Sequence, residues 1–195
     1  MINNPDCGIG SVENILSWIE RPYFSNYALV YRSRSLQGPH RVDYLNPRAI
    51  VYGTDQGFNL PNLIMAFNGS SAQPGFNSLE MMELNVNAPS IEGLFNFFEV
   101  EFPGSGSPGP IRVSAFNPPK CIRCHGSPAK PVFDSYPFWP GVFGSMRFPT
   151  PHVINLESTH YSNFISRAAR HSRYQFLTPY KQESSCVGSD CSFLS

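Results

Sequence analysis

Proline is concentrated in residues 117–151, and this concentration constrains the fold more than any other feature of the sequence. The stretch contains Pro118, Pro119, Pro128, Pro131, Pro137, Pro140, Pro149 and Pro151. Proline has a fixed φ and no backbone N–H, so it interrupts helix interiors and central strands. We therefore expect residues 117–151 to form a loop-rich lobe without long helices.

The rest of the composition indicates an ordinary globular chain. Hydrophobic residues make up 41% of its 195 residues, which is enough to bury a core without disulfides or metals. The net charge is +0, so the overall field favours neither nucleic acid nor an anionic membrane. The sequence contains no apolar run of about 18 residues, and we expect no transmembrane segment.

Hydrophobic periodicity predicts one helix followed by an antiparallel meander in residues 11–117. Residues 11–20 have apolar side chains at i, i+3, i+4 and i+7, with Ser11 as a suitable N-cap. Alternating, β-rich segments predict strands at residues 26–36, 47–53, 62–69, 78–85, 94–102 and 109–117. Helical spacing returns at residues 156–172.

These elements predict a single α+β domain over residues 1–180. Its parts are an antiparallel sheet of about five or six strands, a helix at each end, and the loop lobe of residues 117–151. Residues 181–195 are polar and rich in serine, and we expect a flexible tail there.

The loop lobe contains the sequence CIRCH at residues 121–125, which is the attachment signature of c-type haem. In that chemistry two thiols three residues apart add across the two vinyl groups of haem, and the adjacent histidine becomes an axial iron ligand. We expect Cys121 and Cys124 to hold the haem and His125 to be the proximal ligand. The distal ligand is open between Met146, His152 and an empty sixth position.

An aromatic-rich run follows the motif, and it has two compatible interpretations. Its side chains form the core of the loop lobe, or they line a haem edge and keep it dry; we expect Trp139 to do both. Arg123, Lys130 and Arg147 are candidate partners for the haem propionates.

Zinc is the main alternative ligand for the motif. Cys121 and Cys124 have zinc-knuckle spacing, and Cys186 with Cys191 could complete a tetrahedral thiolate site. The second pair is spaced differently and lies in the tail, and this arrangement leaves His125 without a role. A redox CxxC pair is disfavoured because no thioredoxin-like βαβ pattern surrounds it.

The sequence contains no catalytic motif that we recognise. It has no G-x-S-x-G nucleophile elbow, no Walker loop and no HExxH. We assign no catalytic residues, and an electron-transfer or haem-binding protein is favoured over an enzyme.

Several segments resemble a family of bacterial envelope proteins that carry a single cytochrome-c-type haem motif. The resemblance rests on SRSLQ (33–37), PRAIVYG (47–53), AFNG (66–69), SLEMMELN (78–85), NPPKCIRCHG (117–126) and FDSYPFWPGVFGS (133–145). The CxxCH motif followed by an aromatic-rich WPG(Y/F)G segment is its most distinctive part. The resemblance implies covalent haem c and a periplasmic or cell-envelope location.

The sequence thus predicts a monohaem c-type cytochrome-like protein that transfers one electron. A haem-based sensor or binding module and a zinc-stabilised structural protein are the alternatives. A periplasmic location requires an export signal, and residues 1–10 do not resemble one. The redox partner is not identified by the sequence.

Overall fold

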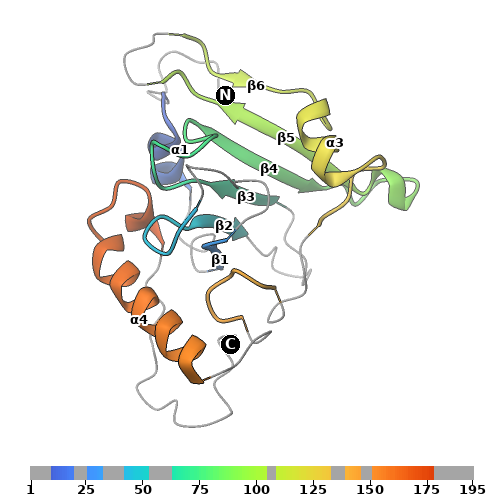
Figure 1. Cartoon of the computed structure of the whole chain (residues 1–195). Coiled ribbons are helices and arrows are strands. Elements are labelled where there is room, and N and C mark those ends of the chain that lie inside the picture. The colour runs from blue at the N-terminus through green and yellow to red at the C-terminus, as the bar shows by residue number, and fades with distance from the viewer. Residues whose placement is uncertain are drawn as a thin grey trace.

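The computed structural model describes residues 10–19, 26–32, 42–52, 63–104, 109–132, 139–145 and 151–177, and for residues 151–154 it describes the backbone alone. These residues form one six-stranded antiparallel sheet with three helices, which confirms the predicted α+β fold. Figure 1 shows the sheet at the centre, α3 beside one end of β4 and β5, and α4 on the opposite side of the molecule.

The strands follow each other in space in the order of the sequence, as predicted for a meander. They are β1 (Tyr27–Val30), β2 (Arg48–Tyr52), β3 (Leu63–Phe67), β4 (Ser78–Leu84), β5 (Phe95–Glu101) and β6 (Arg112–Val113). The helices are α1 (Val12–Trp18), α3 (Pro119–His125) and α4 (Pro151–Ala168), with short 3-10 turns η3 (Ile91–Gly93) and η4 (Tyr174–Phe176).

The two faces of the sheet pack against different helices, because successive strand residues point to opposite faces. On the first face, Val51, Met65 and Val100 form the main core with Leu16 of α1 and Phe164 of α4. On the second face, Met82 and Phe97 pack against Ala129 and Cys121, which lie on or just after α3. We call this second surface the α3 face.

Both edges of the sheet are closed by loop backbone. At the β1 edge, the amides of Tyr31 and Arg32 donate to the carbonyl of Gly141, at 2.8 and 3.1 Å. At the β5 edge, the backbone and side chains of Ser114 and Asn117 continue the pairing after β6. At the β1 edge, loop backbone therefore takes the place that another strand would occupy.

Several predictions differ from the observed elements; the strand predicted at residues 26–36, for example, ends at Val30. β6 is two residues long because side chains after Val113 replace the regular ladder. The last helix was predicted at residues 156–172 and instead begins at Pro151, since proline is well tolerated in the first turn of a helix. The CIRCH sequence was predicted in a loop, and it lies in the seven-residue helix α3 for the same reason, with Pro119 at its first position.

Candidate functional site

The helix α3 carries the whole CIRCH motif and is bounded by residues suited to its ends. Pro118 is extended and Pro119 begins the helix, where its missing N–H costs nothing. Gly126 ends the helix with a φ of +80°, a conformation that side chains other than glycine rarely adopt. The local sequence therefore specifies a helix of this length and no longer.

The three chemically active residues of the motif share one face of α3. Residues at i, i+3 and i+4 are neighbours on a helix surface, which groups Cys121 with Cys124 and His125. Both thiols are free; Cys121 is partly buried and Cys124 is exposed. Burial, followed by the nearby carboxylates of Glu80 and Glu99, raises the pKa of the Cys121 thiol.

The raised pKa of Cys121 bears on the redox-pair alternative. Dithiol oxidoreductases depend on a cysteine whose pKa is depressed, so that thiolate is abundant at neutral pH. The environment of Cys121 instead raises its pKa, which reduces the amount of thiolate. The structure therefore gives no support to a reactive CxxC pair.

The His125 ring is held in place by two contacts. It stacks on Phe97 of β5, with ring centroids 4.0 Å apart and an interplanar angle of 28°. Its Nδ1 lies 2.9 Å from the carbonyl oxygen of Lys130, whose own amide donates back to the His125 carbonyl at 3.1 Å. Because a carbonyl only accepts, Nδ1 is the protonated nitrogen of the neutral ring and Nε2 keeps its lone pair.

Phe97 also fixes the chain that enters α3. Its amide donates to Asn117 Oδ1 at 2.9 Å, and its carbonyl accepts from the Asn117 amide at 2.7 Å. Asn117 has a φ of +52°, which asparagine tolerates better than most residues. One sheet residue thus holds both ends of α3, through its backbone at the start and its ring at the end.

A salt bridge attaches α3 to the sheet. Lys120 Nζ lies 2.7 Å from both carboxylate oxygens of Glu99, whose side chain is only 6% exposed. Burial alone would lower the pKa of Lys120, but the hydrogen bond and charge of Glu99 raise it overall. The ammonium group therefore stays charged and offsets the buried carboxylate.

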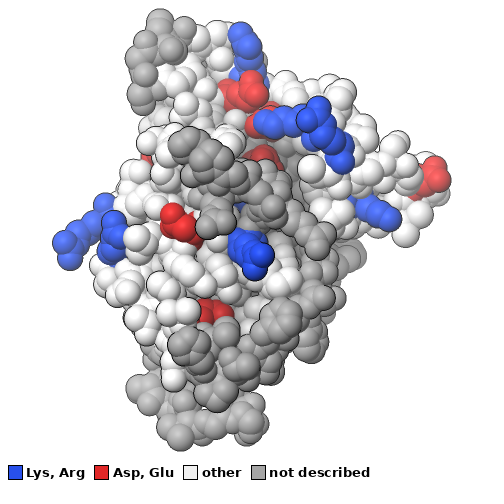
Figure 2. Space-filling model, viewed as in Figure 1, with Lys and Arg blue, Asp and Glu red and all other residues white. Residues whose placement is uncertain are grey.

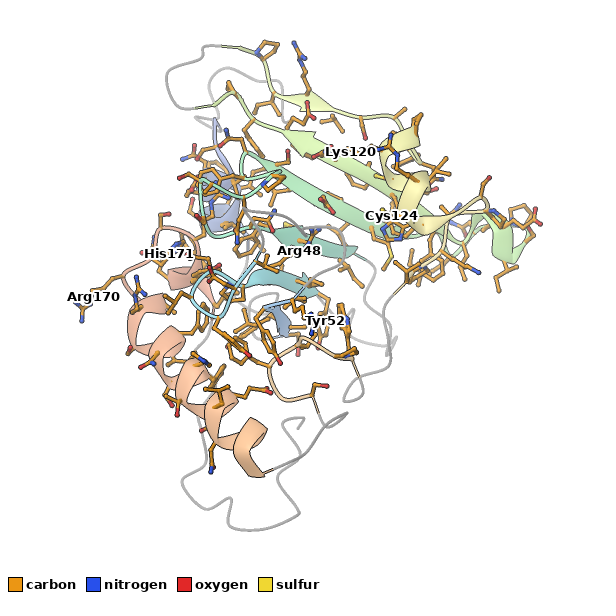
Figure 3. The ribbon with its side chains drawn as sticks, viewed as in Figure 1. Arg48, Tyr52, Lys120, Cys124, Arg170 and His171 are labelled. Carbon is orange, nitrogen blue, oxygen red and sulfur yellow. The ribbon has the colours of Figure 1, made fainter. Side chains whose placement is uncertain are left out.

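A second ion pair lies beside the first on the α3 face. Arg48 of β2 donates through Nη2 to Glu80 of β4, and the Arg48 side chain is 9% exposed. Burial alone would raise the pKa of Glu80, but Arg48 lowers it overall, with smaller contributions from Lys120 and His125. In Figure 3, Arg48 is labelled over the middle strands, and Lys120 and Cys124 on α3.

Apolar side chains connect α3 with Trp139 across the same face. Cys121 packs on the cluster of Met82, Phe97 and Ala129, while Trp139 packs on the cluster of Val30, Ile50, Ala66 and Val142. Ile64 of β3 contacts both clusters. The α3 face thus presents an apolar strip that runs from β5 towards β2, about 14 Å at the usual strand spacing.

These residues fit a covalently attached haem. The two thiols have the required spacing on one helix face, and His125 offers Nε2 while Lys130 fixes its other nitrogen. Most of the adjoining apolar side chains are buried, but Ile64, Trp139 and Phe95 are only partly buried and would contact a porphyrin edge. Within the described part of the chain, Arg48 Nη1 is a buried nitrogen without a hydrogen-bond partner. That donor would suit an anionic group on a ligand.

The remaining predicted site residues are less well placed or lie elsewhere. Arg123 and Lys130 are exposed to solvent. His152 lies in the first turn of α4, where the structure describes the backbone alone. Met146, Arg147, Cys186 and Cys191 lie outside the described residues, so the distal ligand and the four-cysteine zinc site stay predictions. Among the described residues, no three His, Cys, Asp or Glu side chains gather as a metal site.

The sequence did not identify five residues that shape this site. They are Arg48, Glu80, Phe97, Glu99 and Asn117. For two of them the sequence contained a usable pattern. The alternation in residues 94–102 predicts that Phe97 and Glu99 lie on the same face of the strand. The side chains of Arg48 and Asn117 act across long sequence separations that no local pattern encodes.

Comparison of the chain with family models, with curated proteins and with solved structures gives no significant match to any of them. No helix in the described ranges combines the length and apolar character that crossing a membrane requires. On the face shown in Figure 2, acidic and basic side chains lie interspersed.

Proposed function

We propose that this chain is a monohaem c-type cytochrome-like protein that transfers single electrons through a haem held by Cys121 and Cys124. The observation that carries the proposal is the orientation of the His125 ring and the position of its proton. Its ring is stacked on Phe97, and its Nδ1 donates to the Lys130 carbonyl, so Nε2 is left as the only lone-pair nitrogen. Ligating histidines in metalloproteins are commonly oriented by such a bond from the other ring nitrogen.

The chain's own residues would perform three tasks for a bound haem. Cys121 and Cys124 would hold it covalently, His125 would bind its iron, and the apolar side chains around Ile64 would keep water away from it. When bound, the haem supplies an iron that cycles between ferric and ferrous states. An exposed Cys124 leaves one side of the site close to solvent, which suits electron exchange with a partner.

The proposal also assigns a compartment. Covalent haem attachment by this chemistry takes place outside the bacterial cytoplasm, so we infer a periplasmic or cell-envelope location. The redox partner would be another protein of that compartment, and nothing in the site selects a particular one.

The decisive experiment is a pyridine haemochrome spectrum of chain exported together with the c-type maturation machinery. We expect a c-type α-band in the parent protein and none in the Cys121→Ala/Cys124→Ala variant. Folded, exported parent protein without covalent haem would overturn the proposal, and zinc content would then be measured on the same sample.

The number of ligands on the iron would distinguish an electron-transfer protein from a haem-based sensor. Electron transfer favours an iron with both axial positions filled, so we expect the reduced protein to resist carbon monoxide. Met146→Leu and His152→Leu variants would then identify the distal ligand as the one whose loss opens the iron to carbon monoxide. Rapid binding of carbon monoxide by the parent protein would favour a sensing or ligand-binding role.

A further inference from the structure

Arg48 is a buried cation with an unused hydrogen-bond donor. Its side chain is 9% exposed, and Nη2 is paired with Glu80, but Nη1 is buried without a partner in the part of the chain that the structure describes. Buried donors are rarely left unpaired, because a buried donor has lost its hydrogen bonds to water and gained none in return. This nitrogen therefore has no partner among the described residues, and a bound ligand could supply one.

The position of Arg48 places its guanidinium on the same surface as α3. Ala66 of β3 lies opposite both Ile50 of β2 and Glu80 of β4 in the sheet register. The small alanine side chain allows Arg48 to extend from β2 across β3 to Glu80. The Glu80 carboxylate accepts from Arg48 Nη2. Glu80 lies opposite Glu99 in the sheet register, and Glu99 binds Lys120 of α3, so Arg48 reaches the neighbourhood of α3.

The missing partner should be an anion. Lys120 is matched by Glu99 and Arg48 by Glu80, which leaves Nη1 as a donor on a charged group. A guanidinium presents its N–H groups in a planar fork, so it can donate to carboxylates on more than one side. The exposed Arg123 and Lys130 lack the desolvated setting that makes such a bond strong.

We propose that Arg48 binds a propionate carboxylate of the haem, with the guanidinium shared between that propionate and Glu80. The assignment rests on the proposed function, since it requires haem on α3. It makes Arg48 a cofactor-binding residue on β2, far in sequence from the CIRCH motif. It also gives the Arg48–Glu80 pair a role, because Glu80 would hold the guanidinium ready before haem arrives.

The test compares four exported, haem-loaded proteins: the parent, Arg48→Met/Glu80→Gln, Glu80→Gln and Arg170→Met. The double variant removes Arg48 without leaving the Glu80 carboxylate unpaired, and Glu80→Gln keeps the guanidinium in place. Arg170 is an exposed arginine at the far end of α4 and serves as the matched control. Each protein is measured by haemochrome content, by the propionate bending band in resonance Raman spectra, and by redox titration.

We expect all four proteins to carry covalent haem, and the propionate band to move in the double variant alone. We also expect a severalfold higher ferric-to-ferrous ratio at a fixed potential in the double variant than in Glu80→Gln, because a positive charge near the iron is lost. An unchanged band in a haem-loaded double variant would overturn the Arg48 assignment and leave the proposed function standing. A parent protein without haem would overturn both.

Discussion

Arg173 and Glu13 lie 160 residues apart in the sequence and form an ion pair, with Arg173 Nε 2.6 Å from Glu13 Oε1. Arg173 is only 1% exposed. Its Nη1 donates to the carbonyls of Asn68 and Phe76, at 2.7 and 2.5 Å, and its guanidinium lies 3.5 Å from the centre of the Phe76 ring. A single side chain thus joins α1, the chain after β3 and the segment after α4.

Replacing Arg173 by methionine should therefore destabilise the whole domain. The change leaves the Glu13 carboxylate without its partner and two carbonyls without a donor, and breaking such a buried pair costs about 3 to 5 kcal/mol. Urea denaturation followed by circular dichroism gives the free energy of unfolding. Arg170→Met, at an exposed neighbouring position, should change it by less than about 0.5 kcal/mol. Similar values for both variants would contradict the role assigned to Arg173.

Gly69 is required by the close approach of Tyr174. A Cβ at position 69 would lie 1.8 Å from the Tyr174 hydroxyl oxygen. That hydroxyl is buried and donates to the Pro47 carbonyl at 2.5 Å, so it has little freedom to move. We expect Gly69→Ala to lower the free energy of unfolding by about 1 to 3 kcal/mol or more, from overpacking.

Gly93→Ala is the matched control for this substitution, because a Cβ at position 93 meets its nearest neighbour at an ordinary 3.6 Å. Both variants would be compared with the parent protein by urea denaturation. Equal stability of Gly69→Ala and the parent would show that Tyr174 is less constrained than its contacts indicate.

The stability of the domain should depend on the protonation of His171. Its Nδ1 accepts from the backbone amides of Arg173 and Tyr174, at 3.2 and 3.4 Å, which only the neutral ring can do. Burial lowers the pKa of His171 below its ordinary value of 6.5. The hydrogen bond to the Gly69 backbone and the charge of Glu13 oppose this effect, while Arg173 and Arg167 add to it. The unfolded chain therefore binds the proton more readily than the folded protein.

It follows that this stabilisation is fully present above about pH 6.5 and is lost as the pH falls towards the folded pKa. We expect the urea midpoint of the parent to fall between about pH 7.5 and about pH 5.5. A His171→Gln variant should lose less over that interval. Carboxylates with lowered pKa values, such as Glu13, lose their stabilising effect only at a pH lower than this interval. If the urea midpoint fell equally with pH in His171→Gln and in the parent, protonation of His171 would not be the cause of the pH dependence.

The sheet was predictable because its signal is local. In residues 78–85 and 94–102, alternating apolar residues mark the core face of each strand, and the observed strands fall within these ranges. The strands pair in the order of the sequence, as the predicted meander requires. The predicted helix at residues 11–20 was also found, with Ser11 accepting a hydrogen bond from the amide of Asn14.

The candidate site was only partly predictable, because its supporting contacts are long-range. The CIRCH motif identified residues 121–125 as a candidate site, but no nearby sequence pattern predicts that the His125 ring stacks on Phe97. Glu99 is charged and lies in an alternating strand, so a solvent-facing position was the simplest prediction. Its burial depends on Lys120, 21 residues later, which covers and neutralises it.

The contact between Lys120 and Glu99 should determine how firmly α3 is held on the sheet. Lys120→Met removes an ammonium that is 62% exposed, so little packing is lost, but it leaves the Glu99 carboxylate buried and unpaired. We expect a loss of about 1 to 3 kcal/mol in the free energy of unfolding. Hydrogen exchange of the α3 amides should speed up more than exchange in β2 and β3.

The double variant Lys120→Met/Glu99→Gln separates charge from packing. It removes the buried charge together with its partner, so we expect it to recover most of the lost stability. Lys130→Met, at an exposed position after α3, is the control for loss of a lysine. A double variant no more stable than Lys120→Met would show that the ion pair does not hold the helix.

The two thiols of the motif should differ in reactivity in haem-free protein. Burial and the charges of Glu80 and Glu99 raise the pKa of Cys121, whereas Cys124 is exposed. Alkylation requires thiolate, and each unit of pKa changes the thiolate fraction about tenfold near neutral pH. We therefore expect iodoacetamide to modify the exposed Cys124 faster than Cys121, measured by mass spectrometry of the tryptic peptides.

One further variant and one change of conditions identify the cause of this difference. Glu99→Gln removes one nearby negative charge, which should lower the pKa of Cys121 and increase its alkylation rate while leaving Cys124 nearly unchanged. Addition of urea should equalise the two rates, because unfolding removes both the burial and the carboxylates. Equal rates in the folded protein would mean that Cys121 is not held against Met82 and Phe97, since the contact that slows it would then be absent.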